Sequence, residues 1–273
     1  MQYHDIIYDH RISEKKSFYF HLHDGCEIYY LVSGCVEYFV EKQIYSVGKY
    51  DIFITNHIEI HKPNILDDSN YERISIRFNP EYIKKYSKNG YDLLNCFYNR
   101  PNGMGNKITV TEEQLSQVVE LFKQIDKVQH EKPPYYEIML DNCIIRLLII
   151  LNEASGNLNV KKSDYALSGM LNDVLAYIDD NLGGDLSLAA FEKKFFVSGA
   201  HLCRMFKKMT NSTIHQYIIN KRIAYARELL VTDVSVTEVM EKCGFGDFSN
   251  FIKTFKKYTG STPGNYKQSF LKD

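Results

Sequence analysis

The sequence predicts a multidomain chain: an N-terminal all-β barrel, then a helical segment, then a C-terminal all-α domain with two helix-turn-helix units. Three observations predict this order. Short runs rich in Tyr, Phe, Ile and Val alternate with turn residues in the first part. Apolar residues then recur at helical spacing. Finally, one helical pattern occurs twice, about fifty residues apart, as in an internal duplication.

Composition is that of a globular chain with room for two domains: 273 residues, 44% hydrophobic and 25% charged. Residues 1–167 carry 19 Lys and Arg against 23 Asp and Glu, whereas residues 168–273 carry 14 against 11. The second part is therefore the more basic, which permits a nucleic-acid surface there. The six cysteines form no CxxC pair, and no segment has the pattern of a signal peptide or a membrane span, so we expect a cytoplasmic protein.

The β region extends from Ser17 to Asn79 and indicates a sandwich or barrel, because short strands alternate with turns at regular spacing. We assign residues 1–107 to this domain. The turns are expected at Asp24-Gly25, Ser33-Gly34, Val47-Gly48 and Lys62-Pro63-Asn64.

Residues 108–153 form the predicted helical segment. Thr111 and Gln114 have the spacing of a capping box, and a second helix should follow Pro133-Pro134 and end near Glu153. That second helix is apolar on most of its circumference, so it must be covered on several sides. A second subunit in a homodimer is the favoured cover, and packing wholly within its own domain is the alternative. The polar residues 154–167 are the predicted linker.

The C-terminal domain, residues 168–273, should contain seven short helices. A basic helix at 200–209 carries Leu202, Met205, Phe206 and Met209 on its packing face. Ser235 and Glu238 form a capping box for a later short helix, and a turn at 244–247 joins that helix to a second basic helix at 248–258. The uninterrupted helix at 214–230 spans roughly 25 Å and can space the two basic helices about one DNA turn apart. A single basic amphipathic helix is usually only a solvated face, but the duplication favours DNA binding.

At these residues the chain resembles the AraC-type (AraC/XylS) family of transcription regulators, over roughly residues 168–270. The resemblance implies a sequence-specific regulator, by default an activator, whose partners are double-stranded operator DNA and RNA polymerase. Phe248 is expected either to touch a thymine methyl group or, by preference, to cap the core. The residues carrying the match are His201-Leu202, Phe206-Lys207, Ala226-Arg227, Leu229-Leu230, Gly244-Phe245, Phe251, Phe255-Lys256, Gly260, Pro263 and Tyr266. The base-reading positions it implies are Ala200, Cys203, Arg204, Phe248, Ser249, Asn250 and Lys253. We expect His201, Lys207, Lys208 and Lys257, on the same two helices, to contact DNA as well.

In the β region, His21, His23, Glu27 and Gly34 have the spacing HxHxxxExxxxxxG, and His61 follows. This resembles the first motif of the cupin barrel, whose side chains suit Zn²⁺, Fe²⁺, Mn²⁺ or Ni²⁺. The second cupin motif is altered, because Asn56 and Ile58 stand where Pro and Gly are usual.

In AraC-type regulators the same barrel senses sugars or other small effectors, often without a metal. We therefore expect a small-molecule effector, such as a carbohydrate, at His21, His23, Glu27, Tyr29 and His61, with no metal and no cofactor. The alternatives are a cupin metalloenzyme with an accessory helical domain, and a DNA-binding protein with a purely structural barrel. We expect a regulator without enzymatic activity.

Overall fold

The structure is a computed structural model that describes residues 6–12, 20–23, 25–67, 70–156, 165–166, 169–210 and 212–270. It consists of a β-rich N-terminal part and a helical C-terminal part, as the sequence predicts. Most of the predicted linker, residues 157–164 and 167, lies outside the described residues, as does Ser17. No helix among the described residues is long and apolar enough to cross a membrane.

Two antiparallel sheets form the barrel. The first has the strand order β1-β7-β2-β5-β8, and the second has the order β6-β3-β4-β9. The strands are β1 (Ile6–Ile12), β2 (Cys26–Ser33), β3 (Val36–Val40), β4 (Gln43–Val47), β5 (Ile52–Thr55), β6 (His61–Ile65), β7 (Glu72–Phe78), β8 (Lys107–Ile108) and β9 (Tyr165–Ala166). Strand β9 comes from the segment predicted as linker and pairs with β4.

Strand β2 is buried on both faces, and its side chains alternate between two cores. Ile28 and Tyr30 face the helices outside the barrel, whereas Tyr29 and Leu31 lie in the core between the two sheets. Two predictions about the β region are wrong. Strand β1 precedes the predicted region, and Lys62-Pro63-Asn64 is part of β6 rather than a turn. Pro63 is tolerated there because β6 is an edge strand.

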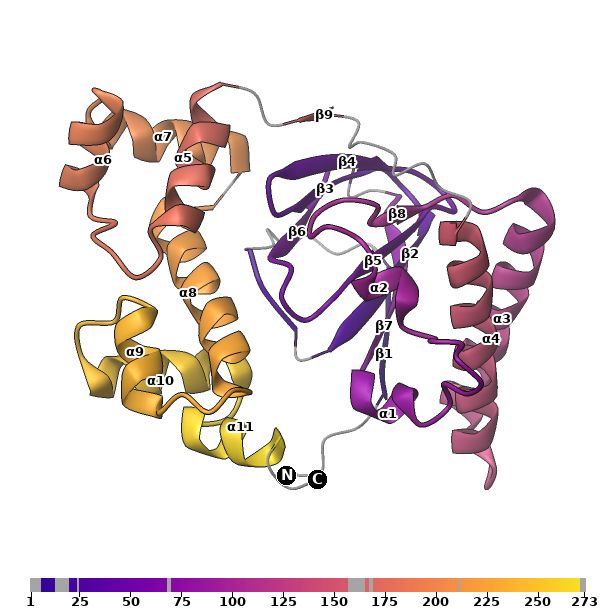
Figure 1. Ribbon diagram of the computed structural model, residues 1–273. Coiled ribbons are helices and arrows are strands. Elements are labelled where there is room, and N and C mark those ends of the chain that lie inside the picture. The colour runs from indigo at the N-terminus through magenta and orange to yellow at the C-terminus, as the bar shows by residue number, and fades with distance from the viewer. Residues whose placement is uncertain are drawn as a thin grey trace.

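Four helices follow in the N-terminal part: α1 (Pro80–Lys84), α2 (Asn95–Tyr98), α3 (Glu112–Glu131) and α4 (Tyr136–Gly156). The capping box of Thr111 and Gln114 at the start of α3 is confirmed. Helices α3 and α4 pack together against the first sheet and cover one side of the barrel (Figure 1). This internal packing buries most of α4, but Ile138 remains 74% exposed beside Tyr135 and Met139.

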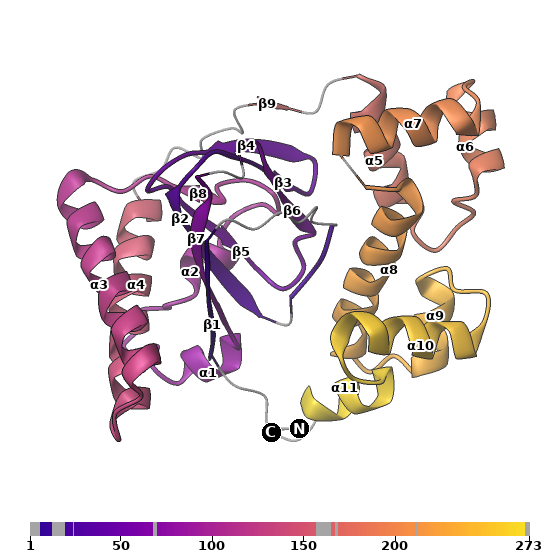
Figure 2. The same ribbon diagram turned by 180° about the vertical axis from the view of Figure 1, so that it is seen from behind.

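The helical part lies on the opposite side of the barrel from α3 and α4 (Figure 2). Its predicted capping box at Ser235 and Glu238 is confirmed, and Gly244 and Gly260 have the expected positive φ, at 72° and 79°. The helices are α5 (Met170–Asp180), α6 (Leu188–Phe195), α7 (Gly199–Thr210), α8 (Ile214–Leu230), α9 (Val236–Lys242), α10 (Phe248–Thr259) and α11 (Pro263–Phe270).

Candidate nucleic-acid interface and effector site

Helices α7 and α10 each bury one face and expose a basic one. Phe206 on α7 and Phe251 and Phe255 on α10 are fully buried, so these side chains hold the helices on the domain. The exposed positions are those expected for DNA contact: Ala200, His201, Arg204, Lys207 and Lys208 on α7, and Phe248, Ser249, Asn250, Lys253 and Lys257 on α10.

Three side chains on these helices differ from expectation. Cys203 is half-buried and packs against the core, so it faces outward less than predicted. Met209, predicted on the packing face of α7, is 41% exposed. Phe248 is 46% exposed at the first position of α10, so the preference for a core-capping role was wrong. An exposed aromatic ring there is free to meet an apolar group such as a thymine methyl.

One contact network fixes the two helix-turn-helix units relative to each other. Arg222, on the connecting helix α8, donates from Nε to the carbonyl of Leu182 and from Nη2 to that of Gly184, both at 3.0 Å. A Cβ at Gly183 would lie 2.6 Å from the carbonyl of Lys242, so only glycine permits this approach of the loop after α5 to the end of α9. Sequence periodicity did not predict these contacts, because they join residues about 40 or more positions apart.

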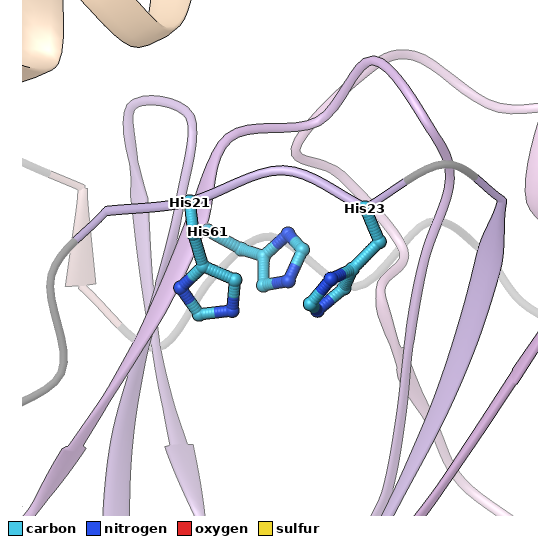
Figure 3. Close-up of side chains that lie close together, drawn as sticks. All are labelled: His21, His23 and His61. Carbon is cyan, nitrogen blue, oxygen red and sulfur yellow. The ribbon is translucent and has the colours of Figure 1, made fainter. Parts of the chain in front are cut away.

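The predicted effector residues of the barrel do come together. His21 and His23 lie on an extended segment, Glu27 and Tyr29 on β2, and His61 at the start of β6, with His21 and His61 exchanging two backbone hydrogen bonds of 3.1 Å. The three imidazole centroids are 4.5 to 5.0 Å apart (Figure 3).

Glu27 lies beneath this His cluster. Its Oε2 is 3.3 Å from His61 Nε2 and 3.5 Å from His23 Nε2. Burial alone would raise the pKa of Glu27, but the two imidazoles hold it well below its usual range. Burial lowers the pKa of His23, against the attraction of Glu27.

A polar cavity of about 170 Å³ opens beside these residues. Of the predicted residues, His21, His23, Glu27 and Tyr29 line it, whereas His61 is fully buried behind the wall. Sequence reasoning missed the remaining polar wall, which includes Asp9, Arg11, Arg73, Ser75 and Arg77.

The missed residues follow a pattern of period two. In β7, Arg73, Ser75 and Arg77 occupy alternate positions, which in a strand places them on one face. Arg73 donates to Asp9 Oδ2 at 2.9 Å and to Ser75 Oγ at 2.8 Å. Burial opposes ionisation of Asp9, yet the hydrogen bonds from Arg11 and Arg73 lower its pKa. The cavity wall thus offers a ligand both positively charged hydrogen-bond donors, from the arginines, and negatively charged acceptors, from the carboxylates.

The barrel also contacts the helical part directly. Phe20, Phe39 and Ile60 belong to the same buried cluster as residues of α5, α6, α7 and α8. Asn220, on α8, is fully buried and donates to the carbonyl of Phe20 at 2.9 Å, and Arg227 donates from Nη2 to the carbonyl of His23 at 2.9 Å. Helix α8 therefore binds the backbone of the segment that carries the cavity histidines.

Comparison with known proteins matches both parts of the chain. Residues 4–155 match the model of the AraC-like ligand binding domain, and residues 192–269 match a model described as a helix-turn-helix domain. The HTH-type transcriptional activator RhaR of Mannheimia succiniciproducens is 24% identical over 92% of this chain and 88% of its own length. RhaS of an Enterobacter species is 27% identical over 58% of this chain, which spans only 56% of that relative.

Among solved structures, the C-terminal domain of AraT, a response regulator from Geobacillus stearothermophilus, is 28% identical over 38% of this chain and 87% of its own, with a TM-score of 0.36. The ligand-binding model alone covers more than half of the chain, and the helix-turn-helix model covers most of the helical part. The chain therefore belongs to the AraC family of ligand-controlled, DNA-binding transcription regulators.

Proposed function

We propose that this protein is a transcription activator that reads its operator with α7 and α10 under the control of a small polar effector bound in the barrel cavity. The observation that carries the proposal is the pair of exposed basic faces at the two ends of one connecting helix, α8. Basic and amide side chains on such faces suit phosphate and base-edge contacts in successive major grooves.

Selection of bound sequences from a random DNA pool tests this proposal. We expect a consensus of two motifs spaced by about one helical turn. Arg204→Ala and Lys253→Ala should each weaken binding, by about 1–3 kcal/mol where the side chain contacts a base. Lys127→Ala, on α3 far from both helices, is the matched control for loss of one cation. Equal affinity of all three variants for DNA would contradict the assignment of the exposed faces of α7 and α10 to DNA contact.

For the effector we propose a small polyol or sugar. The support is the wall of the cavity, whose carboxylate, guanidinium, imidazole and hydroxyl groups can exchange hydrogen bonds with the hydroxyl groups of such a ligand. A panel of sugars screened by thermal shift should include one that raises the Tm of the wild type. Glu27→Gln should lose that shift, whereas Glu37→Gln, on β3 and bonded to Asn64, should keep it.

We propose that the effector signal passes through the two faces of one extended segment. Along residues 20–23, His21 and His23 face the cavity, whereas Phe20 and Leu22 pack toward the helical part. Lys62, next to His61, is buried and donates to the carbonyl of Thr210 at the end of α7 at 2.5 Å. A ligand that shifts the histidines therefore also shifts the surface on which α7 and α8 rest.

We further propose a homodimer that uses the exposed apolar end of α4. Tyr135, Ile138 and Met139 lie together at its start and leave apolar surface in water. Ile138→Glu should shift the sedimentation coefficient of the protein to that of a monomer. Leu66→Glu, at another exposed apolar position, should not.

The remaining assignments are also proposals. We keep the domain boundaries near residues 107, 153 and 167, with Ile108 left in the barrel as part of β8 and the helical segment continued to Gly156, where α4 ends. We also place the protein in the cytoplasm and RNA polymerase among its partners. The relatives are transcription regulators, which supports a role without catalysis.

A further inference from the structure

The wall of the barrel cavity carries more positive than negative charge. Three guanidinium groups line it, against two carboxylates, so one positive charge is left over when the imidazoles are neutral. The guanidinium groups belong to Arg11, Arg73 and Arg77, and the carboxylates to Asp9 and Glu27. A concave site with unbalanced charge attracts a ligand of the opposite sign, so the charge count favours an anion.

Two of these arginines compensate Asp9. Its Oδ2 accepts a hydrogen bond from Arg11 Nε at 2.9 Å and another from Arg73 Nη2 at 2.9 Å. Arg73 is buried, and its Nη1 also donates to Ser75 Oγ at 2.8 Å. Because two guanidinium groups already share this carboxylate, the negative charge of Asp9 does not compensate Arg77.

The other carboxylate, that of Glu27, is bonded to imidazoles and a phenol. Glu27 on β2 and Arg77 on β7 are directly opposite in the strand register, yet no ion pair joins them in the described part of the chain. Glu27 Oε2 lies 3.3 Å from His61 Nε2 and 3.5 Å from His23 Nε2, and it accepts from the Tyr38 hydroxyl at 3.4 Å. The excess positive charge of the wall is therefore located at Arg77.

Arg77 also keeps unused hydrogen-bond donors. A guanidinium has five N–H donors and no acceptor, so the contact of Arg77 Nη1 with His23 Nδ1 at 3.2 Å is a donation to a neutral imidazole. This is the one hydrogen bond of Arg77 within the described residues. The side chain is half-buried and lines the cavity. A carboxylate can accept two parallel N–H bonds from such a group, which fixes both its position and its orientation.

The wall beside Arg77 suits hydroxyl groups. Ser75 is two positions away on the same face of β7, about 7 Å along the strand. Its Oγ accepts from Arg73, and its hydroxyl proton can still be donated to a ligand. The cavity volume of about 170 Å³ is below the roughly 300–1,000 Å³ of sites for drug-sized ligands, so it suits a molecule about as large as a monosaccharide.

We propose that the effector is a sugar acid, a polyol of monosaccharide size with one carboxylate, and that Arg77 binds this carboxylate. One negative charge matches the single excess positive charge of the wall, whereas a phosphate monoester carries about −1.5 to −2. The inference rests on the proposed function, which makes this cavity the effector site. It adds the charge of the ligand and the residue that recognises that charge.

Matched pairs of probes test the charge of the ligand on the full-length protein. Gluconate is compared with sorbitol, glucuronate with glucose, and galacturonate with galactose, at equal concentration and ionic strength. We expect at least one acid to raise the Tm. By isothermal titration calorimetry, that acid should bind about tenfold or more tightly than its neutral counterpart, because hydrogen bonds to charged groups are the stronger ones. Tighter binding of glucose 6-phosphate than of every acid would refute the carboxylate.

Variants test the role of Arg77. Arg77→Gln should weaken the binding of the acid about tenfold or more, through loss of the positive charge. Arg77→Lys keeps the charge without the planar fork and should restore part of this affinity. Arg146→Gln, at an exposed arginine of α4, is the matched control and should bind the acid as the wild type does. Circular dichroism of each variant shows that it is folded when binding is measured.

The possible failures are distinguishable. Equal affinity of the wild type and Arg77→Gln for the acid would overturn the assignment of Arg77. A neutral sugar that binds more tightly than every acid would overturn the charge of the ligand, yet it would support the effector cavity of the proposed function. No Tm shift with any of these probes would overturn the sugar acid and count against a sugar effector, whereas DNA binding is tested independently by the selection experiment.

Discussion

A four-charge cluster joins the barrel to the helical part, and its central cation is the most informative residue to remove. Lys221, on α8, lies 2.6 Å from Glu41 Oε2 of the barrel and 3.0 Å from Asp179 Oδ1 of α5. Lys42 of the barrel pairs with the other oxygen of Asp179 at 2.8 Å. Opposite charges therefore alternate across the interface, and Lys221→Met breaks the alternation.

The magnitude follows from these distances. At 2.6 Å and an effective dielectric constant of about 20, the Lys221–Glu41 attraction is roughly 6 kcal/mol before desolvation is subtracted. The side chains are only 14% and 10% exposed, so removing one partner leaves the other charge largely buried. Removing one partner of a fully buried ion pair lowers the free energy of unfolding by about 3–5 kcal/mol. Because this pair is slightly exposed, we expect a loss of about 3 kcal/mol for Lys221→Met.

The assay is a double-mutant cycle on the full chain, with the free energy of unfolding measured by urea titration. Lys221→Met and Glu41→Gln should show a coupling energy of about 1–3 kcal/mol, because the residues touch. The control pair is Lys221→Met with Glu112→Gln, at the start of α3 on the far side of the barrel, whose effects should add within about 0.5 kcal/mol. A coupling below about 0.5 kcal/mol between residues 221 and 41 would refute the view that this contact holds the domains together.

Three further predictions concern stability. Glu59→Gln should lower the free energy of unfolding by about 3–5 kcal/mol, because its buried arginine partner loses its counter-charge; a chevron or urea curve equal to the wild type would contradict this. Gly244→Ala should lower the free energy of unfolding by about 1–3 kcal/mol, since φ is 72° and a Cβ would lie 2.7 Å from the carbonyl oxygen of Leu182. Gly264→Ala, whose Cβ would meet nothing within 4 Å, should by contrast leave the Tm unchanged or raise it. Ser235→Ala should lower stability by about 0.5–2 kcal/mol through loss of a capping box, measurable as a lower urea midpoint.

Local features of this protein were predictable from the sequence. The caps at Thr111 and Ser235, the uninterrupted helix 214–230 and the paired amphipathic helices all appear at the expected residues. Each depends on interactions within one or two helical turns, so the residues that determine it are neighbours in the chain. The family resemblance, confirmed by the matched models, likewise arose from motifs within the single stretch 168–270.

The effector site was predicted only in part. The histidine spacing identified His21, His23 and His61, but the arginines of β7 and the acid and arginine of β1 were missed. Alternation within Glu72–Phe78 places Arg73 and Arg77 on one face, yet no local signal says which face meets the cavity. That choice is made by the pairing of β7 with β1 and β2.

From the sequence alone came the order of the domains, the two basic amphipathic helices and the histidines of the barrel, because these depend on short-range periodicity and motif spacing. The tertiary structure alone decided how the parts meet: Asn220 bonds to Phe20 across 200 positions of chain, and Lys221 bonds to Glu41 across 180. The physical reason is that burial and charge pairing depend on distance in space, and distant segments become neighbours only when the whole chain has packed.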